Sequence, residues 1–421
     1  MAKQNKPAIR FKGFTDAWEQ RKLGEILQER NTRTSDFESN PLYSLTIESG
    51  VTPKTDRYER SSLVTKTEDL FKTVKPNEFV TNPMNLRFGA LGYNKNAFTV
   101  SVSGYYDVFS IDDDKCSGFW NAYFKTPTAM NIFDNAATGS LIEKRRVKYS
   151  TLQQLAFYMP NDLSEKAEIG KYMDTFDNLI TLHQRKYDKL QVLKKAMLEK
   201  MFPRNGSSVP EIRFKGFTDA WEQRKFDEVF DCTIPNNTLS RAELNYESGS
   251  VRNIHYGDIL IKYGSVVDVQ NDEIPFATGK SSDDFKGALL QDGDIIIADT
   301  AEDETTGKAC EIGNSQGLDV VSGLHTMVCR PRNKMALGYL GYYLNSDAYH
   351  HQLLPLMQGI KVLSLSRTNV QKTMVCYPKS KAEQQLIADC FRNLDNLITL
   401  HQRELEKLQN IKKSMLEKMF V

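Results

Sequence analysis

The sequence lacks long hydrophobic runs, and it has almost no excess of charge of either sign. No stretch of 18 apolar residues occurs, and the first ten residues, MAKQNKPAIR, contain no apolar segment of the kind that a secretion signal needs. These absences argue against membrane insertion and secretion, so we expect a cytoplasmic protein. The net charge is +1, with 55 Lys and Arg against 54 Asp and Glu. Any contact with nucleic acid must therefore come from local basic clusters or be shared with partners.

Cysteine is scarce and scattered. The six cysteines are Cys116, Cys232, Cys310, Cys329, Cys376 and Cys390. No CxxC motif occurs, so the pattern indicates reduced, mostly buried thiols of a cytosolic protein rather than a disulfide framework or a zinc site. We therefore expect no metal to be bound by this chain.

Motifs that carry catalysis are missing as well. TNPMN at Thr81–Asn85 lacks the second proline and the aromatic residue of the NPP-aromatic loop of amino-methyltransferases. TGKSS at Thr278–Ser282 has Ile274 where a phosphate-binding loop needs its first glycine. The acidic run ADTAEDE at Ala298–Glu304 is typical of a solvated turn, with a metal site as the alternative. We expect a chain without catalytic residues.

The sequence does contain a double repeat. IRFKGFTDAWEQRK runs from Ile9 to Lys22 and returns unaltered from Ile212 to Lys225, and DNLITLHQR begins at Asp177 and again at Asp395. The offsets are 203 (212 − 9) and 218 (395 − 177), so the second copy has gained 15 residues between the two repeats. The chain therefore consists of two copies of one plan: a fixed opening, a variable middle and a fixed closing helix.

The opening repeat carries a local signal for the start of a helix. Asp16 followed by Glu19 fits a capping box, and Trp18 and Leu23 supply apolar side chains for docking. This pattern predicts a short helix that closes each domain.

The variable middles are rich in strand signals. Residues 77–112 alternate aromatic and β-branched side chains with Gly and Asn turns, which predicts several strands. In the second middle, GDILIKYG (257–264) and QDGDIIIADT (291–300) are short apolar segments behind Gly-Asp turns, and each predicts a strand.

The closing segments repeat apolar residues every seven positions, which predicts long helices over Ser164–Phe202 and Lys381–Phe420. Each helix would be roughly 60 Å long, and an antiparallel pair of the two would cover both apolar stripes. The helix-packing residues are Ile169, Phe176, His183, Leu190 and Met197 in the first copy and Ile387, Leu394, His401, Leu408 and Met415 in the second. Pairing centred on the repeats would bring both histidines into one layer, either as a polar layer that fixes the register or as two ordinary core histidines.

Basic, aromatic and small polar residues gather in equivalent parts of the two middles. The candidates for DNA contact are Arg87, Tyr93, Lys95, Lys144, Arg145, Arg146 and Lys148 in the first middle, and Lys262, Tyr263, Lys361, Ser364, Arg367 and Lys372 in the second. Such mixtures suit phosphate contacts with a few contacts to base edges. Taken singly, each residue is better explained as a solvated surface charge, and only the clustering in equivalent places favours nucleic acid.

This arrangement resembles the specificity subunit of type I restriction–modification systems. The resemblance rests on the duplicated GFTDAWEQRKLGEI-type opening, on the middles that end at Pro160 and Pro378, and on the helix EQQLIADCFRNLDNLITLHQRELEKLQ. It covers essentially the whole chain, although EKAEI at Glu165–Ile169 stands where the second copy has EQQLI at Glu383–Ile387. The resemblance implies an α+β fold in which two globular α/β target-recognition domains are separated by two long antiparallel helices, related by a pseudo-two-fold repeat.

The resemblance also implies boundaries and partners. The first recognition domain would span residues 1–160, the first spacer helix 161–203, the second domain 204–378 and the second spacer helix 379–421. Each domain would read one half of an asymmetric bipartite double-stranded DNA target. The helices would set the spacing, which suits half-sites about one helical turn apart, and would dock two modification (methyltransferase) subunits.

Restriction subunits with translocase and nuclease activity would join this assembly. S-adenosylmethionine, ATP and Mg would belong to the partner subunits, so no cofactor is expected on this chain. The alternative is a DNA-independent scaffold, with two protein-binding adaptor domains on a coiled coil. An autonomous nuclease or methyltransferase is disfavoured by the missing motifs.

Overall fold

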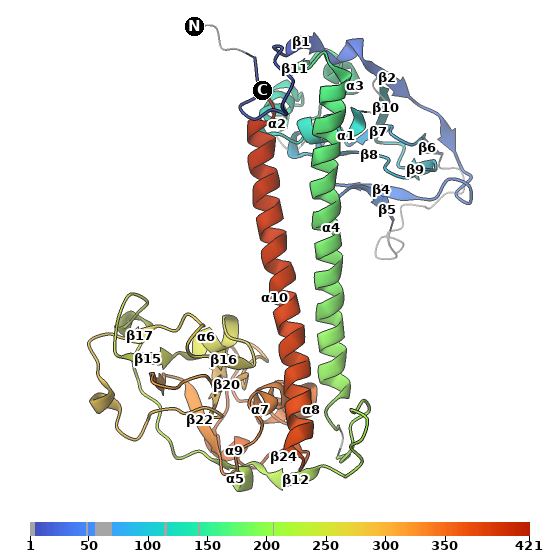
Figure 1. The fold of residues 1–421 in the computed structure, drawn as a ribbon. Coiled ribbons are helices and arrows are strands. Elements are labelled where there is room, and N and C mark those ends of the chain that lie inside the picture. The colour runs from blue at the N-terminus through green and yellow to red at the C-terminus, as the bar shows by residue number, and fades with distance from the viewer. Residues whose placement is uncertain (1–4, 48, 55–69, 113–115, 142–143, 205) are drawn as a thin grey trace. The chain divides into compact units, whose positions relative to one another are not determined.

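The computed structural model describes residues 5–47, 49–54, 70–112, 116–141, 144–204 and 206–421. It divides into two units, Met1–Gln184 with Gln402–Val421, and Arg185–His401. Each unit contains a mixed α/β domain and segments of two long helices, α4 (Leu163–Lys200) and α10 (Lys381–Lys418) (Figure 1). The expected mixed fold with an internal repeat and two long helices is confirmed.

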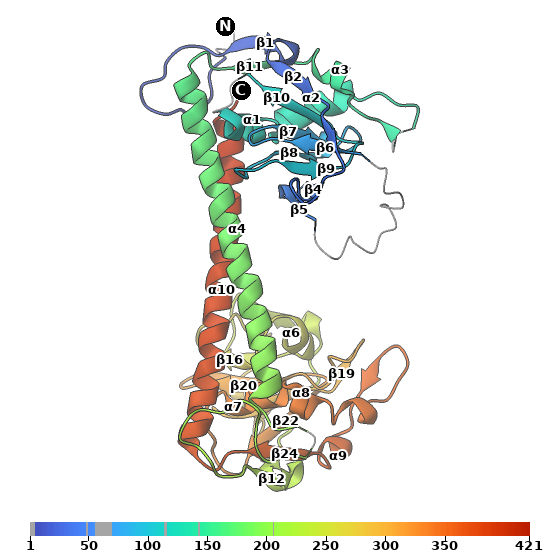
Figure 2. The same cartoon turned by 90° about the vertical axis from the view of Figure 1, so that its right-hand side faces the viewer.

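The domain of the first unit is built from small antiparallel sheets. One sheet has the strand order β2 (Leu27–Arg30), β10 (Asp107–Ile111), β7 (Phe79–Thr81) and β8 (Leu91–Tyr93), as Figure 2 shows. The other sheets are β3 (Arg33–Thr34), β6 (Phe71–Val74) and β9 (Val100–Val102); β4 (Tyr43–Thr46) with β5 (Gly50–Pro53); and β1 (Glu19–Lys22) with β11 (Ala156–Met159). Strands β7 to β10 confirm the strand prediction for residues 77–112.

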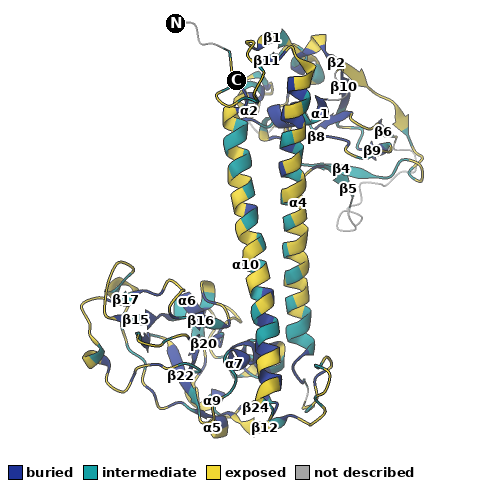
Figure 3. Cartoon of the chain, viewed as in Figure 1, coloured by how far each residue is buried: buried dark blue, intermediate teal, exposed yellow. Residues whose placement is uncertain are grey.

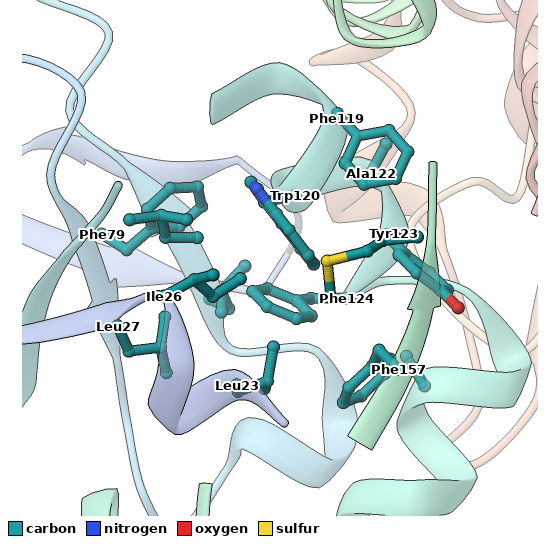
Figure 4. Packing of buried hydrophobic residues seen from close by; sticks show 14 of the residues in the cluster. Leu23, Ile26, Leu27, Phe79, Phe119, Trp120, Ala122, Tyr123, Phe124 and Phe157 are labelled. Carbon is teal, nitrogen blue, oxygen red and sulfur yellow. The ribbon is translucent and has the colours of Figure 1, made fainter. Parts of the chain in front are cut away.

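Short helices complete this domain and supply much of its core. They are η1 (Leu23–Glu25), η3 (Leu86–Phe88), α1 (Ser117–Tyr123), α2 (Pro127–Ala136) and α3 (Tyr149–Leu152). Figure 4 shows Trp120, Phe124 and Phe157 converging in this core, and the ring of Phe124 lies 5.4 Å from that of Trp120 and 5.6 Å from that of Phe157. Full burial of such side chains stabilises the domain by about 1.5–3 kcal/mol each.

The domain of the second unit has larger sheets. One sheet has the strand order β13 (Phe230–Asp231), β22 (Thr326–Pro331), β18 (Ile295–Ala298), β20 (Ala309–Gly313) and β16 (Val266–Asp268). The others are β14 (Leu244–Asn245), β17 (Phe276–Ala277), β15 (Val251–Ile254) and β21 (Asp319–Ser322); β19 (Thr300–Ala301) with β23 (Leu363–Ser364); and β12 (Glu222–Lys225) with β24 (Met374–Tyr377). Figure 3 shows β22 as a mostly buried strand. Its neighbour β18 is buried throughout, which confirms the strand predicted in QDGDIIIADT.

The prediction of a strand at GDILIKYG (257–264) is wrong, because most of this segment is helical. The helices here are η6 (Arg241–Glu243), η7 (Ser282–Phe285), η8 (Leu354–Leu356), α5 (Phe226–Val229), α6 (Tyr256–Ile261), α7 (Tyr339–Leu344), α8 (Asp347–His350) and α9 (Arg367–Val370). Most of GDILIKYG lies in α6, which the His255 side chain caps by accepting a hydrogen bond from the Gly257 N–H at 3.1 Å. A short apolar run suits either structure, and the cap together with burial of Ile259 favours the helix.

The opening repeat forms a strand where a docking helix was predicted. Strand β1 pairs with β11, with Glu19 opposite Met159, and β12 pairs with β24 in the equivalent register, with Glu222 opposite Tyr377. The helix prediction is therefore wrong in both copies. The peptide groups of this segment find partners on the strand that precedes each closing helix, and this distant pairing outweighs the local capping signal. Trp18 is buried, as the pattern indicated.

In the first unit, the start of α4 packs against the end of α10. Lys412 Nζ contacts Asp177 Oδ1 at 2.5 Å, and Ile169 of α4 shares a hydrophobic core with Met419, which follows α10. The contact partners therefore run in opposite directions: the residue number decreases from Asp177 to Ile169 on α4 while it increases from Lys412 to Met419 on the other segment. The two segments are therefore antiparallel.

The second unit repeats this arrangement with the copies exchanged. Lys194 Nζ contacts Asp395 Oδ1 at 2.5 Å, and the rings of Phe202 and Phe391 stack with centroids 5.8 Å apart. Lys194 and Asp395 are the counterparts of Lys412 and Asp177 at the offset of 218. Each unit thus joins the start of one closing helix to the end of the other.

The predicted helix-packing residues divide between the two units. The first unit contains Ile169, Phe176, Leu408 and Met415, and the second contains Leu190, Met197, Ile387 and Leu394, all of them buried or half-buried. His183 and His401 are half-buried. Their meeting in one layer stays a prediction.

Candidate nucleic-acid interface

The repeated opening segment carries a buried ion pair that fixes the first domain to its closing helix. Arg10 Nε and Nη2 donate to Oε1 and Oε2 of Glu165 at 2.5 and 2.7 Å, and Trp18 Nε1 donates to Oε1 at 3.4 Å. Glu165, in the first turn of α4, is 1% exposed. We call this group the first anchor. A forked, two-bond contact of this kind fixes orientation as well as distance.

The second unit has the same anchor. Arg213 Nε and Nη2 donate to Oε1 and Oε2 of Glu383 at 2.7 and 2.9 Å, and Trp221 Nε1 donates to Oε1 at 3.2 Å. The repeated letters therefore preserve an arginine and a tryptophan that hold the start of the closing helix. The same Arg–Trp–Glu interaction therefore joins two different domains to their closing helices.

Lys144, Arg145 and Arg146 lie on a loop that we call the first closing loop, which comprises residues 138–141 and 144–146 of the described chain. Thr138 and Arg146 exchange both backbone hydrogen bonds at 3.0 Å and close its base. A Cβ at Gly139 would lie 2.9 Å from Arg145 Cα, so only glycine fits at this close approach. The side chains of Lys144 and Arg146 are exposed.

The second closing loop, residues 358–364, occupies the equivalent place in the second unit. Gln358 and Ser364 exchange backbone hydrogen bonds at 3.0 and 2.8 Å. Ser364 is the counterpart of Arg146 at the offset of 218. Gly359 has φ +127°, and a Cβ there would lie 1.9 Å from the Val362 carbonyl oxygen, so this loop also requires glycine. Lys361 is exposed within it.

Further exposed cations flank the two closing loops. Lys148 precedes α3, and Arg367 begins α9, where the Ser366 hydroxyl accepts a hydrogen bond from the Asn369 N–H at 3.2 Å. Lys372 follows α9 and is exposed. The second loop also faces acidic residues, because β23 pairs with β19, which leads into the exposed acidic residues 302–304.

Two of the predicted DNA-contact arginines have partners within the first domain. Arg145 donates from Nε to the Ala137 carbonyl at 3.2 Å and from Nη2 to the Asp134 carbonyl at 2.6 Å. Arg87 pairs with the Asp134 carboxylate at 3.1 Å and lies over the Phe88 ring. Both side chains support the fold beneath the first closing loop.

Tyr93 and Lys95 fix the first domain to α4. The Tyr93 hydroxyl donates to Asp174 Oδ2 at 2.9 Å, and burial raises the pKa of Tyr93 above its usual range. Lys95 Nζ contacts Asp174 at 2.7 Å and Asp177 at 3.4 Å. These acceptors lie about 80 residues away in the sequence, so spacing gave no sign of the contacts.

Lys262 and Tyr263 are also engaged within the second domain. Tyr263 is 4% exposed and donates to the Glu273 carbonyl at 3.3 Å. Lys262 Nζ contacts the Glu273 carboxylate at 2.6 Å and lies 4.7 Å from the centroid of the Tyr246 ring. Tyr246, which sequence reasoning missed, is 42% exposed, and the Arg241 guanidinium lies 5.5 Å from its ring centroid.

The described residues contain no cluster of three or more His, Cys, Asp or Glu side chains arranged to hold a metal ion. Within the same residues, no helix is long and apolar enough to cross a membrane.

Comparisons with known proteins match this architecture. The family model of the type I restriction modification DNA specificity domain matches residues 15–192 and 218–410. The type I restriction enzyme MjaVIII specificity subunit of Methanocaldococcus jannaschii is 23% identical over 264 residues, which are 60% of this chain and 59% of that protein. The match thus spans less than two thirds of that relative's length.

One of the solved structures compared with this chain has a similar fold. The type I restriction–modification S subunit from M. genitalium has a TM-score of 0.56 at 14% identity, covering 99% of both chains. The HsdS subunit from Thermoanaerobacter tengcongensis has a TM-score of 0.41 at 15% identity, covering 96% of both chains. The two regions of the family match each take in one variable domain and most of its closing helix. The duplicated frame is thus the frame of a known family, and the chain belongs to the type I restriction modification DNA specificity domain family.

Proposed function

We propose that this chain is the DNA-reading subunit of a type I restriction–modification complex, and that each variable domain reads one half of an asymmetric bipartite target on double-stranded DNA. The observation that carries the proposal is the mounting of two unlike domains by identical anchors, Arg10–Trp18–Glu165 and Arg213–Trp221–Glu383. Identical mounts present the two readers equivalently, while their different surfaces select different bases. The recognition domains are residues 1–160 and 204–378, and the spacer helices, which set the distance between half-sites, are residues 161–203 and 379–421.

The closing loops are the proposed site of DNA contact. The proposed contact residues are Lys144, Arg146 and Lys148 in the first unit, and Lys361, Ser364, Arg367 and Lys372 in the second. Their side chains are exposed, and exposed Lys and Arg side chains suit phosphate contacts, which fix position and register. Arg87, Tyr93, Lys95, Arg145, Lys262 and Tyr263 stay predictions from the sequence. Tyr93 and Lys95 also fix the first domain to α4, and the other four make contacts within their own domains.

The partners in this proposal are two copies of a modification (methyltransferase) subunit, docked on the repeated DNLITLHQR segment. Leu179 and Leu182 of the first copy are 38% and 47% exposed, and their counterparts Leu397 and Leu400 are 43% and 52% exposed. The same two leucines are partly exposed in both copies of the repeat, which fits two identical partner subunits that each bind one copy. S-adenosylmethionine, ATP and Mg would be held by the methyltransferase and restriction subunits, and the complex would act on DNA in the cytoplasm.

The leucine pairs give a test of docking. We expect the double substitution Leu179→Glu with Leu182→Glu to reduce the number of bound methyltransferase subunits from two to one, because a charged side chain opposes burial of the docking face. The variant with Leu397→Glu and Leu400→Glu should do the same, and the fourfold variant should bind none. Native mass spectrometry of co-purified complexes measures the stoichiometry. Val192→Glu is the matched control, because Val192 is 70% exposed and lies outside the repeat. Two bound subunits in the fourfold variant would contradict this docking site.

The experiment that tests the function is a DNA titration with and without the methyltransferase subunits at several salt concentrations. With 55 basic against 54 acidic residues, the chain alone has no net attraction for DNA, so we expect weak binding with little selectivity. Addition of the methyltransferase should produce tight binding to one bipartite sequence. The outcome that would favour the DNA-independent scaffold is an absence of selective binding in both conditions.

Single substitutions in the same assay test the closing loops. Arg146→Ala and Lys361→Ala should each weaken binding and lower the slope of log K against log salt by about 1, because each removes one phosphate contact. Lys215→Ala is the control, since Lys215 is exposed but lies in the opening repeat. An unchanged slope for both loop variants would place the DNA elsewhere.

A further inference from the structure

Two cysteines face each other across the edge of the larger sheet in the second unit. Strand β13 pairs with β22 so that Asp231 lies opposite Arg330, which places the next residue, Cys232, opposite Cys329. Cys232 is 4% exposed and Cys329 is 1% exposed, and their sulfur atoms are 3.0 Å apart. Both cysteines are free thiols in this structure.

The hydrogen bonds of this strand pair show which kind of pair the cysteines form. Arg332 N–H donates to the Val229 carbonyl at 2.8 Å, so Val229 and Arg332 form a hydrogen-bonded pair. Such pairs alternate with non-hydrogen-bonded pairs along an antiparallel ladder. Cys232 is the first residue after β13, and by this alternation it and Cys329 take a non-hydrogen-bonded position, the kind in which Cα atoms lie about 4.5 Å apart and side chains approach most closely. This separation falls within the range of about 4.4–6.8 Å that a disulfide requires.

We propose that Cys232 and Cys329 form a modification site, a dithiol that exchanges with low-molecular-weight disulfides such as glutathione disulfide and closes to a cross-strand disulfide. The inference is independent of the proposed DNA function, because it rests on the strand register and the sulfur positions alone. The two cysteines would then be reactive thiols, whereas cysteines that only fill space in the core are unreactive.

The order of the exchange follows from the position of each cysteine. Strand β13 is the edge strand of its sheet and has only two residues, so local opening at this edge exposes Cys232 before Cys329, which is on the inner strand β22. The hydrogen bond between the two thiols also lowers the pKa of Cys232, whereas burial raises the pKa of Cys329. Cys232 is thus the attacking thiol.

The reaction balances with glutathione disulfide as the oxidant. The Cys232 thiolate attacks one sulfur of glutathione disulfide, forms a mixed disulfide and releases one glutathione. The Cys329 thiolate then attacks the Cys232 sulfur and releases the second glutathione. The protein loses two electrons and two protons, and glutathione disulfide takes up both the electrons and the protons to become two glutathione molecules.

The cross-link would restrict the unfolded chain over a long loop, since the two cysteines are 97 positions apart in the sequence (329 − 232). Restricting a loop of this length favours the folded state. Oxidation of the folded protein should therefore raise the melting temperature of the second unit, and a reductant should return it to the starting value.

The test is oxidation of the fully reduced, full-length chain with glutathione disulfide, followed by alkylation of the remaining thiols and peptide mass spectrometry. We expect one linked peptide pair that contains Cys232 and Cys329, and a fall from six alkylated cysteines to four (6 − 2). The melting temperature should rise in parallel, and dithiothreitol should reverse both changes.

Cys232→Ser is the matched variant, and its circular dichroism spectrum reports whether the fold is kept. It should give no linked peptide and no rise in melting temperature on oxidation. Cys376→Ser, which removes another buried cysteine, should behave like the parent chain. The proposal is overturned if the folded parent keeps six alkylated cysteines, if a stable glutathione adduct remains on Cys232, or if the linked peptides join other cysteines.

Discussion

Replacing Glu383 with alanine should destabilise the second unit by about 3–5 kcal/mol, and Glu165→Ala should destabilise the first unit by a similar amount. Each carboxylate is 1% exposed and accepts hydrogen bonds from an arginine fork and an indole N–H. Its removal leaves the Arg213 or Arg10 guanidinium in a site where the side chain is only 12% exposed, without its buried acceptor. The effect should be large because a buried charge has lost its partner.

Denaturant unfolding followed by tryptophan fluorescence measures this loss, because Trp18 and Trp221 belong to the two anchors. Glu211→Ala is the control, since Glu211 is 67% exposed in its ion pair with Lys200 and should contribute less than about 1 kcal/mol. Equal and small effects of Glu383→Ala and Glu211→Ala would show that the anchors do not hold the domains.

Exchange of one variable domain should change one half of the DNA target and leave the other half intact. The segments to exchange are residues 20–160 and 223–378. These boundaries keep Arg10, Trp18 and Glu165 of the first anchor within the parent chain, and they keep the second anchor in the same way. They also move β11 together with most of β1, so the strand pair stays matched.

The donor domain for this exchange should preserve the contacts that the variable domain itself makes with the closing helix, in addition to the anchor. In the first unit, Tyr93 and Lys95 bind Asp174 and Asp177 of α4, so a donor with hydrogen-bond donors at these positions is the suitable choice. In the second unit, the Tyr342 hydroxyl donates to Asp395 of α10 at 2.8 Å and plays the corresponding part. With a donor that lacks such groups, a change in the methylated motif could result from poor packing of the domain on its helix rather than from a change in DNA recognition.

The parts of the fold that the sequence predicted correctly are those with strong local or repeated signals. The heptad pattern predicted helices over Ser164–Phe202 and Lys381–Phe420, and the structure has them at Leu163–Lys200 and Lys381–Lys418. A continuous apolar run predicted β18. The frame of two copies followed from the repeats themselves.

The errors occurred where distant partners decide the structure. Glu19–Lys22 carries a helix-capping signal, yet its backbone pairs with residues 156–159, nearly 140 positions away. The contacts of Tyr93 and Lys95 with carboxylates on α4 were likewise not foreseen, and their contact with DNA stays a prediction. A single sequence does not show such contacts, because neither spacing nor composition encodes which distant residue lies opposite.

The candidate DNA surface was predicted in part. The basic cluster before Pro160 was visible as a run of charges, and the structure shows that Lys144 and Arg146 are exposed while Arg145 turns inward. The glycines that close the two loops, Gly139 and Gly359, were the missed signal. Each glycine directly follows the first residue of the backbone bridge that closes its loop, Thr138 with Arg146 and Gln358 with Ser364.

The most direct measurement is methylome sequencing of a host that carries this chain with its methyltransferase partner, compared with hosts that carry either domain exchange. The parent chain should produce one split, asymmetric methylated motif. Exchange of residues 20–160 should alter one half of the motif, exchange of residues 223–378 should alter the other, and the double exchange should combine both changes. A motif in which either single exchange altered both halves, or neither, would contradict the account of two independent readers on a common frame.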